Sequence, residues 1–87
     1  EEEAVLGHIL IVDDDRSLLT ILSQLLGEDY GVTTCSSGRE ALEVLATGDV
    51  DLVLLDIMMP EMDGLEVCRV LRADGTIPIL MLTPMVR

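Results

Sequence analysis

A chain of 87 residues with 17 acidic and 5 basic side chains has room for one small domain and carries a net charge of −12. Nucleic acid and anionic membranes would repel it, so we expect neither as a partner. Its residues are 49% apolar, which excludes a disordered acidic tail. No apolar run approaches the ~20 residues of a membrane-spanning helix, so we expect a cytoplasmic protein.

Strand-like and helix-like segments alternate along the chain. Short apolar or β-branched runs predict strands, and leucines or valines at helical spacing after a capping residue predict helices. The expected elements are a strand at 8–12, a helix at 16–27, a strand at 31–35, a helix from 37 to 48, a strand at 52–55, a helix from 63 to about 74, and a strand at 77–83. This order predicts an α/β fold with a parallel sheet built from right-handed βαβ units.

Acidic residues follow two of the expected strands. Asp13, Asp14 and Asp15 come directly after the first strand, and Asp56 ends the apolar run at 52–55. Because ligands of open α/β sheets bind at the carboxyl ends of the strands, these acids are expected to form one anionic pocket. Carboxylates without nitrogen or sulfur ligands suit Mg²⁺. With that metal, an aspartate can attack a phosphoryl donor and form an aspartyl-phosphate.

A simpler interpretation competes with this one. Residues 13–15 could have a purely structural role at a helix N-terminus, where acids cap free N–H groups and complement the helix dipole. Asp56 could be a turn residue before Pro60. Capping does not explain a lone acid that closes an apolar strand, so the joint arrangement favours the metal and phosphoryl site.

Three segments resemble the receiver domain of response regulators in two-component signalling. They are ILIVDDD at 9–15, DIMMPEMDGLE at 56–66 and PILMLT at 78–83. The resemblance implies a flavodoxin-like, doubly wound sheet with strand order 2-1-3-4 and a phosphorelay function. It further implies Asp56 as phosphoacceptor, Mg²⁺ bound by Asp13, Asp14, Asp56 and the Met58 backbone carbonyl, Thr83 as the phosphoryl-contacting switch, and Pro60 and Gly64 in the loop after the acceptor.

The chain also departs from the family pattern. The usual last strand and last two helices have no counterpart, the family's active-site lysine is absent because the sequence contains no lysine, and Pro84 replaces a small residue. The expected organisation is an acidic tail at 1–7, a truncated receiver domain at 8–83 and a C-terminal tail at 84–87. Without the lysine, we expect phosphotransfer to be impaired while metal binding survives.

The resemblance implies that the phosphodonor is a histidine kinase or a histidine phosphotransfer protein. The strand at 79–82 has no predicted neighbour on its outer side, and the helix at 16–27 has two leucine-rich stripes. Both features predict a homodimer. An alternative is a degenerate receiver that acts by dimerisation or protein interaction without phosphorylation. A phosphohydrolase of the aspartyl-phosphate type is disfavoured, because position 58 is Met where a second acid would act.

Overall fold

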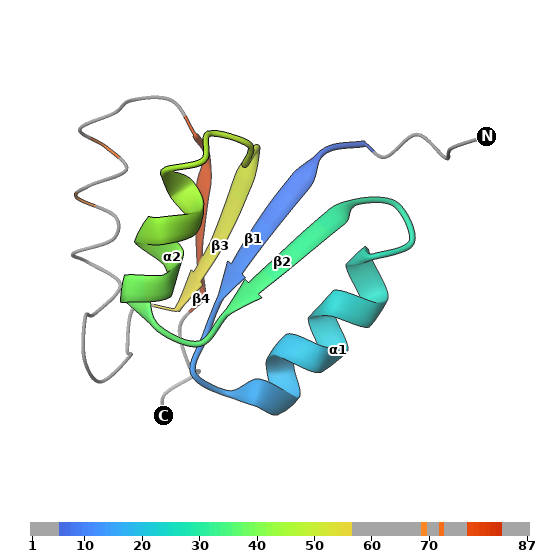
Figure 1. The fold of residues 1–87 in the computed structure, drawn as a ribbon. Helices are drawn as coiled ribbons and strands as arrows, with labels where there is room; N and C mark the ends of the chain where they lie inside the picture. Colours follow the sequence, from blue (N-terminus) through green and yellow to red (C-terminus); the bar gives the residue numbers. More distant parts are fainter. Residues whose placement is uncertain (1–5, 57–68, 70–71, 73–76, 83–87) are drawn as a thin grey trace.

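The computed structural model describes residues 6–56, 69, 72 and 77–82. Its elements are β1 (His8–Val12), α1 (Arg16–Leu26), β2 (Gly31–Cys35), α2 (Gly38–Leu45), β3 (Leu52–Asp56) and β4 (Ile79–Leu82). The four strands form one parallel sheet in the order β2-β1-β3-β4 (Figure 1). The α/β class, the parallel sheet and the strand order predicted from the sequence are therefore confirmed.

The sheet has an apolar core on each face. On one face, side chains of β1 and β3, including Leu10 and Leu55, pack with Ala41 of α2. On the other, Ile9 and Ile11 of β1 pack with Leu19 of α1. Successive strand residues point to opposite faces, so the uninterrupted apolar runs of β1 and β3 fill both cores.

Each described helix begins at a side-chain cap. The Asp15 carboxylate accepts hydrogen bonds from the backbone N–H groups of Ser17 (3.0 Å) and Leu18 (3.2 Å). Ser37 caps α2 by accepting from the Glu40 N–H, and the Glu40 carboxylate accepts in return from the Ser36 N–H. Ser37 and Glu40 therefore form a capping box, although its return bond reaches the residue before the cap.

Two predicted helix boundaries differ from the structure or fall beyond it. α2 ends at Leu45, earlier than the predicted Gly48, because the chain turns through Gly48 at a φ of +84°. Of the helix predicted from position 63, only Arg69 and Arg72 are described, and both are helical and exposed. Among the described residues, no helix is long and apolar enough to cross a membrane.

The cap of α1 can be tested directly. Asp15→Ala removes an acceptor of two backbone N–H groups, so we expect the free energy of unfolding to fall by about 1 kcal/mol. Asp15→Asn keeps a capping oxygen and should lose much less. Urea denaturation followed by circular dichroism measures both. Equal stability of Asp15→Ala and the wild type would show that the cap contributes nothing.

Candidate functional site

The acidic residues meet at the carboxyl edge of the sheet. Asp56 is the last residue of β3, and Asp13 directly follows β1. These two strands are adjacent, with Val12 in register with Leu55. The next residue of each strand therefore lies beside its counterpart, which brings the Asp13 and Asp56 carboxyl groups together. Asp14 joins them from the following position.

The cluster is compact and largely buried. One carboxylate oxygen from each of Asp13, Asp14 and Asp56 lies within 4.8 Å of the other two. Asp13 and Asp56 are only 5% and 8% exposed, whereas Asp14 is exposed. The site therefore has two acids at its base and one at the solvent boundary, an arrangement that a hydrated cation could reach.

Backbone hydrogen bonds fix the position of Asp13. Its N–H donates to the Cys35 carbonyl at 3.0 Å, which extends the contact between β1 and β2 by one residue. Its carboxylate accepts from the Asp15 N–H at 2.9 Å. The Asp15 side chain serves the helix N-terminus instead. The acidic run thus divides: Asp13 and Asp14 belong to the cluster with Asp56, and Asp15 is a capping residue.

The crowding of carboxylates has an electrostatic cost. Burial raises the pKa of Asp13 above its ordinary value of 3.8, and the negative charges of Asp56 and Asp14 and a side-chain hydrogen bond with Asp56 raise it further. The hydrogen bond from the Asp15 N–H opposes this by lowering the pKa. A divalent cation among the three carboxylates would relieve the repulsion. An all-carboxylate set of hard oxygen donors fits Mg²⁺.

The sequence predictions for this site divide into two groups. The structure brings together Asp13, Asp14 and Asp56, as expected. The remaining predicted positions lie outside the described residues, so their roles stay predictions: Met58, Pro60, Gly64 and Thr83.

Cys35 is a neighbour of the site that the sequence reasoning did not place there. It ends β2 in register with Val12, and its carbonyl accepts the Asp13 N–H. The thiol is free and buried. Burial raises its pKa to about 11, and the negative charges of Glu40 and Glu43 add to the shift. This environment fits a structural role for the Cys35 thiol, which packs as a small apolar side chain. The sequence did carry a signal for this position. The expected strands at 8–12 and 31–35 have equal length, so Cys35 lies beside Val12 once their first residues pair.

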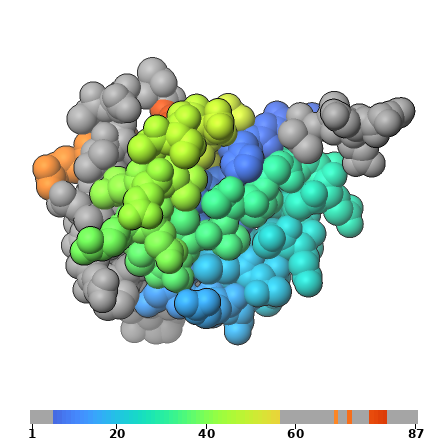
Figure 2. All heavy atoms as spheres, in the orientation of Figure 1, coloured from blue at the N-terminus to red at the C-terminus, as the bar shows by residue number. Residues whose placement is uncertain are grey.

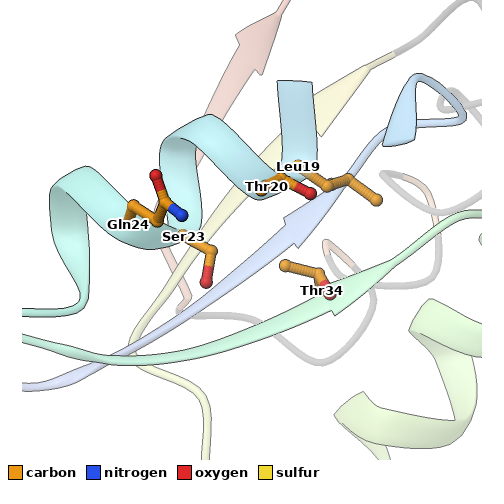
Figure 3. A pocket seen from close by; sticks show the side chains of 5 residues that line it. All are labelled: Leu19, Thr20, Ser23, Gln24 and Thr34. Carbon is orange, nitrogen blue, oxygen red and sulfur yellow. The ribbon is translucent and has the colours of Figure 1, made fainter. Parts of the chain in front are cut away.

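A hollow elsewhere on the surface has a different chemistry. It lies between α1 and β2 and has a volume of about 280 Å³. Its lining comprises Leu19, Thr20, Ser23, Gln24 and Thr34 (Figure 3). None of the clustered acids contributes to it, so it is separate from the site at the carboxyl edge.

Comparison with known proteins assigns the fold and the acidic edge to one family. Residues 9–86 match the response regulator receiver domain. The chain belongs to this family. Receiver domains are signalling modules of two-component systems, and the acid cluster of this receiver domain is the three-aspartate group described above.

Curated relatives extend well beyond the matched region. The receiver domain is 47% identical over 79 residues to the probable transcriptional regulator ycf27 of Cyanidium caldarium, covering 87% of this chain and 31% of that protein. It is 50% identical over 77 residues to the DNA-binding response regulator MtrA of Mycobacterium tuberculosis, covering 87% of this chain and 34% of that protein. The chain thus spans about a third of the length of these relatives.

Solved structures agree with the fold. The activated N-terminal receiver domain of RstA from Klebsiella pneumoniae, bound to BeF3, has a TM-score of 0.84 and 40% identity, covering 93% of this chain and 70% of that one. The response regulator TrrA from Thermotoga maritima, in complex with Mg²⁺ and BeF, has a TM-score of 0.80 and 39% identity, covering 90% and 70%.

The raised pKa of Asp13 predicts how stability depends on pH in metal-free buffer with a chelator. An acid whose folded-state pKa exceeds its unfolded-state value destabilises the fold when ionised, so this contribution worsens as pH rises from 3.8 through the raised pKa. Asp13→Asn should therefore increase the free energy of unfolding at pH 7, and the gain should disappear in acid.

The matched control is Asp49→Asn, which removes the same charge from an exposed position outside the cluster. It separates relief of local repulsion from the general benefit of lowering a net charge of −12. Urea unfolding at several pH values measures all three proteins. A loss of stability for Asp13→Asn at pH 7 would contradict the assigned repulsion.

Proposed function

We propose that this receiver domain accepts a phosphoryl group on Asp56 in a two-component phosphorelay. The observation that supports the proposal is the convergence of Asp13, Asp14 and Asp56, with two of the three acids buried at the carboxyl edge of the sheet. The donor would be the phosphohistidine of a histidine kinase or of a histidine phosphotransfer protein. A cytoplasmic location is part of the same proposal.

The transfer is a displacement at phosphorus. A carboxylate oxygen of Asp56 forms the new P–O bond, the donor's P–N bond breaks, and the released imidazole takes a proton from solvent. Asp13 and Asp14 would hold Mg²⁺ together with Asp56. When bound, the metal supplies positive charge that offsets the phosphoryl oxygens as they approach the acids. The fixed position of Asp13, bonded through its backbone and carboxylate, favours a preorganised metal site.

Four further residues have proposed roles that rest on the family resemblance. The Met58 backbone carbonyl would complete the metal ligands, and the Thr83 hydroxyl would donate to a phosphoryl oxygen. Pro60 and Gly64 would shape the loop after the acceptor. The 87 residues contain no lysine, so a polypeptide of this sequence has one cation fewer at the phosphoryl group. We therefore expect metal binding with slow phosphotransfer.

Metal binding can be measured by stability. Since a ligand that binds the folded state stabilises it, Mg²⁺ should raise the melting temperature of the wild type at pH 7. Asp56→Asn and Asp13→Ala should reduce the rise strongly, because each removes a carboxylate from the cluster. Asp49→Asn, with an equal charge change outside the cluster, should respond like the wild type. An equal response of all four proteins would indicate nonspecific screening of negative charge.

Phosphotransfer can be measured without a partner protein. The polypeptide is incubated with Mg²⁺ and acetyl phosphate, and intact mass spectrometry detects the addition of one phosphoryl group. We expect slow, incomplete modification of the wild type and none of Asp56→Asn. Rapid and complete Asp56-dependent modification would contradict the importance assigned to the lysine. Modification that persists in Asp56→Asn would contradict the proposed acceptor itself.

A second candidate is a degenerate receiver that works by protein interaction alone. It is favoured by large apolar side chains that remain exposed, among them Ile21 and Leu25 of α1 and Leu80 of β4. Assembly and partner binding that survive Asp13→Ala/Asp56→Ala would support it. The DNA-binding function in the name of MtrA belongs to that longer protein. At a net charge of −12, we expect no nucleic-acid binding by these 87 residues. We also expect no phosphohydrolase activity, because position 58 is Met where a second acid would act.

A further inference from the structure

Asp15 contacts both the acidic cluster and the first turn of α1. Its backbone N–H donates to Oδ1 of Asp13 at 2.9 Å. Its own Oδ1 accepts from the N–H groups of Ser17 (3.0 Å) and Leu18 (3.2 Å). Its carbonyl accepts the Leu19 N–H at 3.1 Å. Residue 15 is therefore a hydrogen-bonded link between a carboxyl group of the cluster and the helix.

The bond to Asp13 fixes an orientation that the side chain alone would not hold. Rotation about the Cβ–Cγ bond of an aspartate has only a broad preference, so contacts must set the direction of its two carboxylate oxygens. The Asp15 N–H engages Oδ1 of Asp13 and so orients the whole carboxyl group. Because Mg²⁺ demands near-ideal octahedral geometry, a rotation of this group would spoil the placement of a metal ligand.

The helical side of the link is anchored in the core. Leu19 of α1 is only 7% exposed and packs with Ile9 and Ile11 of β1. Of the three hydrogen bonds that tie residue 15 to α1, two end on the Asp15 carboxylate. The first turn of α1 contains no acid of its own. The Asp15 side chain therefore determines how firmly its backbone N–H is held against Asp13.

Packing does not explain an acid at this position. Asp15 is exposed, and Figure 2 shows α1 at the molecular surface, in blue and cyan. Among the described residues, the acids close enough to share a cation are Asp13, Asp14 and Asp56, without Asp15. The contribution of Asp15 thus lies in its hydrogen bonds, which reach the helix on one side and the cluster on the other.

We propose that Asp15 is a positioning residue of the metal site. Its carboxylate fixes the start of α1, which holds the Asp15 N–H in place to orient the Asp13 carboxyl group for Mg²⁺. The inference rests on the proposed metal site and adds a residue outside its ligand set. Residues that hold a metal ligand in place from outside the ligand set are known to alter metal affinity when they are replaced.

The charge of Asp15 alone would give a different result. Any carboxylate near a cation attracts it, so loss of this charge weakens Mg²⁺ binding whether or not the cap matters. Asp15→Ala and Asp15→Asn remove the same charge, but only asparagine keeps an oxygen that can accept the N–H groups of α1. The difference between these two variants therefore separates the cap from the charge.

The affinity for Mg²⁺ can be measured through the stability of the 87-residue chain. Urea unfolding at pH 7 is followed by circular dichroism over a series of Mg²⁺ concentrations at constant ionic strength. The rise in the free energy of unfolding with Mg²⁺ gives the dissociation constant. We expect Asp15→Ala to bind Mg²⁺ about tenfold more weakly than Asp15→Asn. Asp15→Asn should stay close to the wild type, because solvent and salt screen an exposed charge.

The matched control is Val50→Ala, which lowers stability without touching the link. Val50 is buried in the core and precedes β3, whose other end carries Asp56. The variant should be less stable than the wild type in the absence of metal. Its dissociation constant for Mg²⁺ should stay within about twofold of the wild-type value, because distant sites act independently.

Three results would overturn the positioning role. They are equal Mg²⁺ affinities of Asp15→Ala and Asp15→Asn, a loss of affinity in Val50→Ala as large as in Asp15→Ala, and absence of Mg²⁺ binding by the wild type. The first two leave the metal site and the phosphoacceptor intact, whereas the third removes the metal site as well. Phosphorylation of Asp56 is measured separately with acetyl phosphate, so its failure would not alter the comparison of the Asp15 variants.

Discussion

The parallel pairing of β1 with β3 is the constraint on which the site depends. It forces Asp13 and Asp56 side by side although their negative charges repel. The opposing stabilisation comes from the strands themselves, where Leu10, Ile11, Val53 and Leu55 are completely buried. The repulsion between the carboxylates destabilises one edge of the sheet, and burial of the apolar strand residues offsets it by stabilising the pairing of β1 with β3. The cost is also what makes the edge receptive to a cation.

The loop after β1 serves two needs with three consecutive acids. Asp13 turns inward and is fixed by the Asp15 N–H, Asp14 remains at the solvent boundary, and Asp15 caps α1. The helix cap is therefore confirmed for Asp15, whereas Asp13 and Asp14 join the acidic cluster, for which metal binding stays a prediction. A single loop therefore couples the geometry of the acidic edge to the start of α1.

Strands and helix starts were predictable because each has a local cause. Uninterrupted apolar runs mark β1 and β3, and Ser37 with Glu40 marks the start of α2. The meeting of Asp13 with Asp56 was predictable as well, since parallel strands end at one edge. Other features depend on tertiary packing. Leucines at helical spacing do not reveal that Leu25 stays exposed while Leu19 is buried. The Gly48 turn was visible in the sequence, but the residue at which α2 ends before that turn, Leu45, was not.

Cys35 shows how little redox chemistry the described part of the acidic edge can support. The thiolate is the reactive form of cysteine, and a pKa of about 11 keeps the Cys35 thiol protonated at pH 7. Oxidants and alkylating reagents should therefore react slowly with Cys35, although its carbonyl accepts a hydrogen bond from the Asp13 N–H beside the acidic cluster. The buried Cys35 thiol and the three clustered carboxylates therefore differ in their access to reagents, since Asp14 is exposed and Cys35 is not. Oxidants that attack thiolates would therefore leave the end of β2 beside the acidic cluster unmodified.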